Sequence, residues 1–204
     1  MDLSLQALVD RERVPAGRLE RWLGAVAAGG VAGVQLREKG ALDRTAYAYG
    51  ELVARRVREL GLWFSVDDRL DLALALDSDL VHIGPDDLPP EAVRRVAPHL
   101  GLGLSARNLD ELARAQSCEP LYVGYGPVWP TPSKADASAP VGLEELAEAV
   151  RRSSCPIVAI GGIQADNAPA VWATGVAGLA VISALTEADD PETTARALLA
   201  GRST

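Results

Sequence analysis

The 204-residue chain has few cysteines, no surplus of positive charge and no long apolar run. Cys118 and Cys155 are too few and too isolated for a disulfide framework or a zinc site, so we interpret both as small buried hydrophobic residues. The longest apolar runs, such as Leu72 to Leu76, are far shorter than the roughly 20 residues of a membrane-spanning helix, and no segment resembles a secretory signal. We therefore expect a soluble, cytoplasmic protein.

The formal net charge of -8 argues against a nucleic-acid-binding protein. Proteins that neutralise phosphates along a duplex usually carry a basic stripe, and binding to an anionic membrane surface is disfavoured for the same reason. If the substrate is an anion, the overall field repels it. A few cations must then be concentrated in one cleft.

Short apolar runs alternate along the chain with longer amphipathic stretches, which is the pattern of strand–helix units. The predicted strands are Leu3–Val9, Val31–Leu36, Trp63–Val66, Leu80–Ile83, Gly101–Leu104, Leu121–Tyr125, Ile157–Ile160 and Gly178–Ile182. The predicted helices are Pro15–Ala28, Arg44–Leu60, Arg69–Leu76, Pro90–Ala97, Leu109–Gln116, Leu143–Arg152, Asn167–Thr174 and Pro191–Ala200. Asp43 and Asn108 are predicted N-caps, and Gly175 is a predicted helix stop.

Eight units of about 25 residues each come close to the lower size limit of a (β/α)₈ barrel. We therefore predict an α/β protein with the TIM-barrel fold, formed by residues 1–204 as a single domain. The alternative is a doubly wound open sheet. That fold usually has a glycine fingerprint after its first strand, and the segment Val9-Asp10-Arg11-Glu12 has none.

The segment 124–134, Gly-Tyr-Gly-Pro-Val-Trp-Pro-Thr-Pro-Ser-Lys, has the composition of an anion-binding loop. Its two glycines let a ligand approach the backbone, and its three prolines stiffen the chain. Thr131, Ser133 and Lys134 can donate hydrogen bonds from it. A second glycine turn, Gly161-Gly162, follows the next strand, so we expect a substrate with phosphate at both ends.

Polar residues also gather after the second strand, where Gln35, Arg37 and Lys39 alternate and would point to one face. An amide and two cations facing inward are costly unless an anion meets them. A solvated charged loop is the alternative. Carboxylates follow the next two strands, at Asp67-Asp68 and Asp87, and suit Mg²⁺, although helix capping is the alternative there.

Two further features complete the candidate site. Ser105 follows the fifth strand and could hydrogen-bond a leaving oxygen, although a turn or capping role would account for it equally well. Gly161-Gly162 and Ile182-Ser183 follow the last two strands, where barrels often bind phosphate. His82 lies inside an apolar strand and is interpreted as a hydrogen-bonded core residue without a functional role.

Together these motifs resemble the thiamine-phosphate synthase family over residues 31–185. The resemblance depends on Gln35-Leu-Arg-Glu-Lys39, Val66-Asp-Asp68, Val81-His-Ile-Gly84 with Asp87, Gly103-Leu-Ser105, the segment 124–134, Ala159-Ile-Gly-Gly-Ile163 and Val181-Ile-Ser183. It implies a (β/α)₈ enzyme that joins a pyrimidine diphosphate to a thiazole phosphate, with small phosphorylated heterocycles as its partners. Homodimers are suggested by the resemblance alone.

By position, the resemblance implies that Gln35 contacts the aminopyrimidine. Arg37, Lys39 and Lys134 would hold its diphosphate, and Ser105 would lie near the departing group, so Arg37, Ser105 and Lys134 are the catalytic candidates.

Asp68 and Asp87 would hold the cofactor Mg²⁺ in this family. Thr131 and Ser133 would contact the thiazole. The backbone groups that would hold its phosphate belong to Gly162, Ile182 and Ser183.

Some positions depart from the family pattern. Asp67 stands where the family usually has Asn, which adds negative charge beside the diphosphate unless Lys39, Mg²⁺ or a proton compensates. Pro85 replaces a common Gln, Ser133 replaces a common Thr, and the first strand lacks the family's usual opening.

Two other functions are considered. A thiazole tautomerase would use a His in the loop after the fifth strand, where this chain has Arg107. A catalytically silent phosphate-ligand-binding paralogue remains the other alternative because of Asp67.

Overall fold

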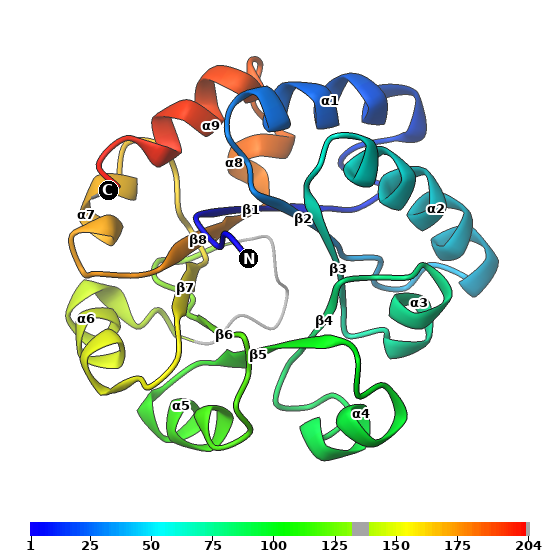
Figure 1. The fold of residues 1–204 in the computed structure, drawn as a ribbon. Coiled ribbons are helices and arrows are strands. Elements are labelled where there is room, and N and C mark those ends of the chain that lie inside the picture. Colours follow the sequence, from blue (N-terminus) through cyan, green and yellow to red (C-terminus); the bar gives the residue numbers. More distant parts are fainter. Residues whose placement is uncertain (132–138, 203–204) are drawn as a thin grey trace.

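The computed structural model describes residues 1–131 and 139–202, and its strands form a closed parallel barrel surrounded by helices (Figure 1). The strands are β1 (Leu5–Val9), β2 (Gly33–Leu36), β3 (Trp63–Asp67), β4 (Leu80–Ile83), β5 (Gly101–Ala106), β6 (Tyr122–Tyr125), β7 (Ile157–Ile160) and β8 (Gly178–Val181). The helices are α1 (Ala16–Ala28), α2 (Asp43–Glu59), α3 (Leu70–Ala75), α4 (Pro90–Val96), α5 (Leu109–Gln116), α6 (Gly142–Arg152), α7 (Ala168–Trp172), α8 (Ser183–Thr186) and α9 (Pro191–Leu199).

The strands pair in chain order, and β1 also pairs with β8 through Leu5 and Leu179, which closes the barrel. The (β/α)₈ prediction is therefore confirmed, and the doubly wound open sheet is excluded. All eight predicted strands and the eight long helical segments are present, with ends that differ by up to a few residues. The short helix α8 was not predicted, because four residues give too little periodicity to detect.

The helices cover the barrel with their apolar faces. Helix α1 buries Leu19, Trp22, Leu23 and Val26, the spacing that places side chains on one face of a helix. The outward residues of the strands, such as Ala7 and Val34, meet these faces and are fully buried in the main core. A second, smaller cluster is formed by Leu8, Leu80, Tyr122, Val158 and Ala180. These side chains alternate with the outward ones, so they fill the barrel interior.

The N-cap prediction at Asn108 is confirmed, because its side chain accepts a hydrogen bond from the Glu111 backbone N–H at 2.9 Å. The one at Asp43 is wrong. Leu42 has the extended cap conformation, and Asp43 is the first residue of α2, where its carboxylate pairs with Arg69 at 2.8 Å. A carboxylate in the first helical turn still interacts favourably with the helix dipole.

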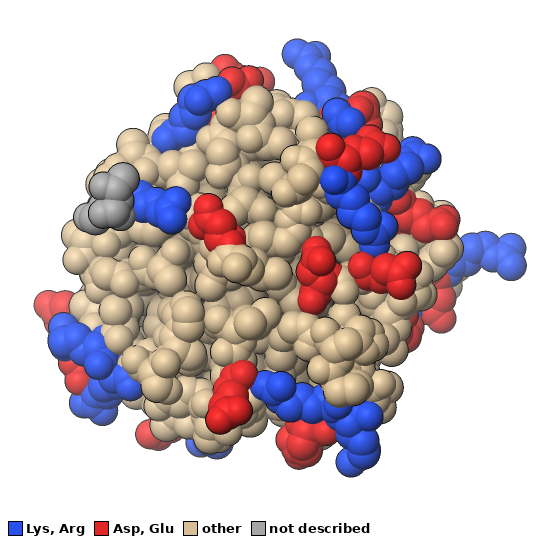
Figure 2. Space-filling view, in the orientation of Figure 1, with Lys and Arg blue, Asp and Glu red and all other residues tan. Residues whose placement is uncertain are grey.

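On the face that Figure 2 shows, Lys and Arg side chains lie mostly toward the edge and beside Asp and Glu, and the charged groups nearest the centre are acidic. No basic patch gathers on this face, and it therefore lacks the positive stripe typical of nucleic-acid-binding proteins. Within the part of the chain that the structure describes, no helix is long and apolar enough to cross a membrane.

Candidate active site

A cavity of about 270 Å³ opens inside the barrel, and residues from the strand ends line it. The structure brings together all the predicted site residues that it describes: Gln35, Arg37, Lys39, Asp67, Asp68, Asp87, Ser105, Thr131, Gly162, Ile182 and Ser183. Ser133 and Lys134 lie outside the described residues. The carboxyl ends of parallel strands meet at one rim of a barrel, which is why residues so far apart in the sequence share one cavity.

The tip of β2 presents two faces, as its alternation predicts. Gln35, Arg37 and Lys39 line the cavity, whereas Leu36 is buried in the core and Glu38 is buried on the opposite side. The ladder also continues past the strand, because the Arg37 backbone N–H donates to the Val9 carbonyl at 2.8 Å. The strand tip is therefore held by backbone pairing up to its first cation.

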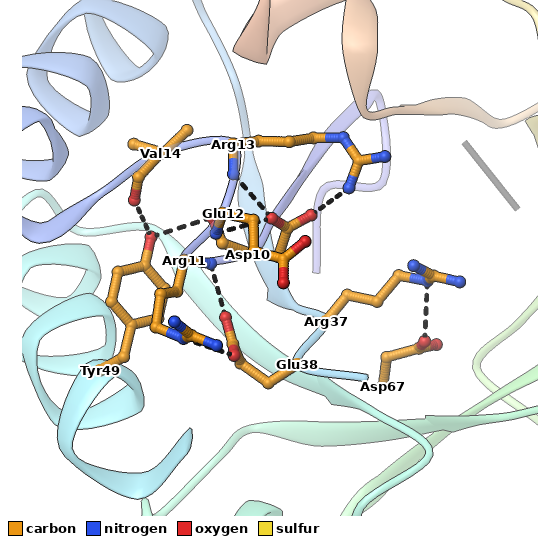
Figure 3. A network of polar contacts seen from close by, with 9 residues as sticks. All are labelled: Asp10, Arg11, Glu12, Arg13, Val14, Arg37, Glu38, Tyr49 and Asp67. Carbon is orange, nitrogen blue, oxygen red and sulfur yellow. Dashed lines mark hydrogen bonds and ion pairs between the residues drawn. The ribbon is translucent and has the colours of Figure 1, made fainter. Parts of the chain in front are cut away.

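Glu38 fastens this tip to the loop between β1 and α1 (Figure 3). Its carboxylate accepts a hydrogen bond from the Arg11 backbone N–H at 2.5 Å and lies 3.5 Å from the Arg11 guanidinium. The Tyr49 hydroxyl donates to the Val14 carbonyl of the same loop at 2.6 Å. The alternating residue that does not face the cavity thus anchors the two that flank it.

Arg37 forms an ion pair with Asp67 of the neighbouring strand, at 3.3 Å, and both side chains are largely buried (Figure 3). Burial and the nearby charge of Asp68 raise the pKa of Asp67 to about 7, although Arg37 and Lys39 act in the opposite direction. Asp67 can therefore exchange a proton near neutral pH, so the negative charge that it adds to the site depends on pH.

Asp68 and Asp87 form a hydrogen-bonded carboxyl pair at the rim. Burial opposes ionisation of Asp68, yet hydrogen bonds with Lys39, 2.9 Å away, and Asp87 hold its pKa below the ordinary value. Burial and Asp68 raise the pKa of Asp87, whose carboxylate also accepts from the Gly84 backbone N–H at 2.7 Å. Neither residue caps α3 or α4, which follow Arg69 and Pro89.

Two carboxylates this close repel each other unless a proton or a cation lies between them. Among the described residues no group of three or more His, Cys, Asp or Glu side chains could hold a metal ion. Mg²⁺, however, usually takes only one or two carboxylates and completes its shell with water and substrate phosphate oxygens. The donor set at Asp68 and Asp87 fits that ion.

His82 is buried and hydrogen-bonded, as predicted, but it also lines the cavity beside Ser105. Its Nε2 lies 2.8 Å from the Ser105 Oγ, and its Nδ1 lies 2.9 Å from the Tyr122 hydroxyl. The His82 and Tyr122 rings stack with centroids 5.5 Å apart. Tyr122 in turn hydrogen-bonds Gln35, so a chain of polar groups runs from Gln35 to Ser105.

No functional role was predicted for His82 or Tyr122, although the sequence carries a signal for them. Strand alternation places His82 on the inner face of β4, and Gly103 and Gly124 on the next two strands, β5 and β6, leave room for its ring. A Cβ on Gly103 would lie 2.7 Å from the His82 Nδ1. Glycines in neighbouring strands are a sign of close approach inside a barrel.

Opposite the carboxylates, the ends of β7 and β8 form a backbone cradle. Gly161 and Gly162 have φ of 95° and 69°, and a Cβ on Gly162 would lie 2.7 Å from the Trp129 Cβ. The Asn167 side chain donates to the Gly162 carbonyl at 3.0 Å and fixes the turn. Ser183 begins α8, whose first N–H groups have no acceptor within the helix.

Arg107, which stands where a tautomerase would have its His, pairs with Glu111 at 2.9 Å and with Asp86 at 3.6 Å. Its guanidinium is always protonated and cannot serve as a general base. This cavity wall therefore offers no acid–base group at that position.

Comparison with known proteins agrees with this geometry. The family model described as thiamine monophosphate synthase matches residues 5–185. A thiamine-phosphate synthase of Roseiflexus sp. (strain RS-1) is 42% identical over 192 residues, which cover 94% of this chain and 81% of that protein. One of Archaeoglobus fulgidus is 45% identical over 170 residues, covering 83% of this chain and 80% of that one.

Among solved structures, the thiamine phosphate pyrophosphorylase of Pyrococcus furiosus superposes with a TM-score of 0.88 at 39% identity, covering 97% of this chain and 94% of that one. Sequence and structure therefore point to the same relatives, and the shared region includes all eight strands. The chain belongs to the thiamine-phosphate synthase family.

Proposed function

We propose that this protein is a Mg²⁺-dependent thiamine-phosphate synthase. The reaction couples 4-amino-2-methyl-5-hydroxymethylpyrimidine diphosphate with 4-methyl-5-hydroxyethylthiazole phosphate and releases thiamine monophosphate and diphosphate. The observation that carries the proposal is the meeting of Arg37, Lys39, the Asp68–Asp87 pair and Ser105 in one cavity. This combination suits the departure of a diphosphate, because each group meets or balances negative charge.

On the pyrimidine side, Gln35 orients the ring, and Arg37 and Lys39 bind the diphosphate. Lys134 is proposed to act with them. Asp68 and Asp87 hold Mg²⁺, which when bound supplies charge neutralisation for the departing diphosphate. Ser105 donates a hydrogen bond toward the leaving oxygen, and its contact with His82 supports this role. If the His82 Nε2–H donates to the Ser105 Oγ, the hydroxyl proton of Ser105 is left to donate to the leaving oxygen.

On the thiazole side, the backbone of Gly162, Ile182 and Ser183 is proposed to bind the phosphate, with Thr131 and Ser133 against the ring. Both phosphorylated ends are then held at opposite walls of the cavity, which leaves the two reacting atoms between them. The pyrimidine methylene carbon loses its bond to oxygen and forms a bond to the thiazole nitrogen. Positioning of this kind can supply several kcal/mol of the catalytic effect.

The test is product formation from both purified substrates, with Mg²⁺ and with excess EDTA. We expect turnover that EDTA abolishes and that Asp68→Ala lowers by about 100-fold or more, since a lost charge ligand costs several kcal/mol. The matched control is Asp189→Ala, which removes an exposed carboxylate that is not among the residues lining the cavity. A folded protein that yields no product, with Asp68→Ala changing nothing, would refute the proposal.

A catalytically silent phosphate-binding paralogue is the second candidate, and the charge of Asp67 beside the diphosphate site is the observation that favours it. It predicts that the thiazole phosphate raises the melting temperature while no diphosphate is ever released. Mg²⁺-dependent diphosphate release would exclude it.

We also propose a cytoplasmic location, which the free thiols of Cys118 and Cys155 support, because disulfides are rare in reducing compartments. A homodimer is proposed from the family resemblance alone. The mass of the purified protein in solution, measured by light scattering, tests it directly.

A further inference from the structure

Gln6 is a fully buried amide in β1 whose side-chain nitrogen and oxygen both lack a hydrogen-bond partner within residues 1–131 and 139–202. A buried amide normally finds at least one partner, because its hydration is lost without replacement. The roles proposed above do not use this residue. Its presence in an apolar strand therefore needs a separate explanation.

Gln6 is one of the residues that line the active-site cavity. Its backbone pairs with Gly33 of β2 and Ala180 of β8, and Leu8, two residues further along β1, pairs with Gln35. Because residues two apart point to the same face, Gln6 and Gln35 both face the interior, with Gln6 one step deeper. Gln35 has the Tyr122 hydroxyl as a partner, whereas Gln6 has none among the described residues.

Ser65 provides an internal comparison. It is also fully buried and its hydroxyl also lacks a partner in the described part of the chain, but it is not among the residues that line the cavity. An unpaired polar group at Ser65 has no access to a ligand. Gln6 is equally buried, but it belongs to the cavity lining, so its unpaired amide is the one that lies beside a ligand on the cavity floor.

We propose that Gln6 binds the polar edge of the pyrimidine ring of the substrate and, with Gln35, selects that heterocycle. This inference rests on the proposed function. The aminopyrimidine carries two ring nitrogens and an amino group, so a deep position requires both donors and acceptors from the protein, which an amide supplies together. The thiazole has one ring nitrogen, which must face the reacting carbon and cannot point to the cavity floor.

The test uses Gln6→Met, which keeps the length of the side chain and removes both polar atoms. We expect the KM and the calorimetric Kd for the pyrimidine diphosphate to rise by about 10-fold or more, as for the loss of a buried hydrogen bond to a ligand. The KM for the thiazole phosphate should stay within about twofold. The melting temperature of the unliganded protein should be unchanged or higher, because the variant no longer buries an unpaired amide.

Ser65→Ala is the matched control. It should also leave the melting temperature unchanged or higher, because it too removes an unpaired buried polar group, the Ser65 hydroxyl. It should alter neither the KM nor the Kd for the pyrimidine diphosphate. The inference is overturned if Gln6→Met binds the pyrimidine diphosphate as the wild type does, or if only binding of the thiazole phosphate is affected. It is also overturned if Gln6→Met and Gln6→Leu both melt at a lower temperature than the wild type, because the amide would then have a structural role.

Failure of the proposed function looks different. A wild-type protein that releases no product refutes the synthase assignment, whereas an active enzyme with an unaffected Gln6→Met variant refutes only the role of Gln6. If the wild type is inactive, the calorimetric Kd for the pyrimidine diphosphate still decides the binding role.

Discussion

Replacing Asp67 with Asn should make the protein more stable at alkaline pH. The pKa of Asp67 is raised from 3.8 to about 7 in the folded state, because burial and the charge of Asp68 disfavour ionisation. The folded protein therefore holds a proton that the unfolded chain has released, and stability is lost as the pH rises from about 4 to about 7. A difference of roughly three between the folded and unfolded pKa values corresponds to a full cost to folding stability of about 4 kcal/mol.

Part of this cost is already present at pH 5, where the unfolded carboxyl is ionised and the folded one is not. Linkage between a pKa of about 3.8 in the unfolded chain and about 7 in the folded protein gives a cost of roughly 2 kcal/mol at pH 5 and roughly 4 kcal/mol at pH 8. Asn resembles the protonated carboxyl and does not titrate. The stability advantage of Asp67→Asn should therefore grow by about 2 to 3 kcal/mol from pH 5 to pH 8.

The assay is urea unfolding of both proteins at the two pH values, with EDTA present so that no metal occupies the neighbouring carboxylates. Asp189→Asn, at an exposed carboxylate, is the control and should show no such growth. At pH 8 the KM for the pyrimidine diphosphate should also be lower in Asp67→Asn, because one negative charge beside it is gone. An advantage that is equal at both pH values would contradict the reasoning.

Two other substitutions test the cavity walls. His82→Leu removes the hydrogen bonds of the ring to Ser105 and Tyr122. Because the Ser105 hydroxyl is then no longer oriented, we expect kcat to fall by about 10-fold while the KM for the thiazole phosphate stays within about twofold. An unchanged kcat would show that the contact is only structural. Gly162→Ala should raise the KM for the thiazole phosphate and lower the melting temperature more than Gly142→Ala does. Both glycines have positive φ, of 69° and 71°, but a Cβ on Gly162 would meet Trp129 at 2.7 Å whereas one on Gly142 would meet nothing within 4 Å. Gly142→Ala alone should cost about 1 kcal/mol, and equal effects would argue against a tightly fitted cradle.

Much of the candidate site could be predicted because strand ends in a barrel share one rim. Gln35, Arg37 and Lys39 were recognised from their alternation, which needs only the period of a strand. Asp68 and Asp87 were recognised from their position after neighbouring strands, but their hydrogen bond to each other could be found only in the tertiary structure. Asn108 was predicted correctly as a cap because capping is a local interaction between residues close in sequence.

Other features depend on distant neighbours and were missed for that reason. Asp43 looks like a cap in the sequence, but its partner Arg69 lies 26 residues away, directly before α3. His82 looks like an ordinary core histidine until Ser105 and Tyr122 are placed on either side of its ring. Gln6 attracts no notice in the sequence, because only the absence of a partner among the described residues makes it unusual.

The sequence by itself determined the order of strands and helices, the inner and outer faces of each strand, and the chemical types at the strand ends, because these follow from local periodicity and residue chemistry. Only the tertiary structure decided which of those groups touch, since closure of the barrel brings β1 against β8 and sets the distances across the cavity. The raised pKa of Asp67, the contact of His82 with Ser105 and the unpaired amide of Gln6 all depend on which side chains the other strands bring beside them. Burial and distance are properties of the folded chain and not of any segment of it.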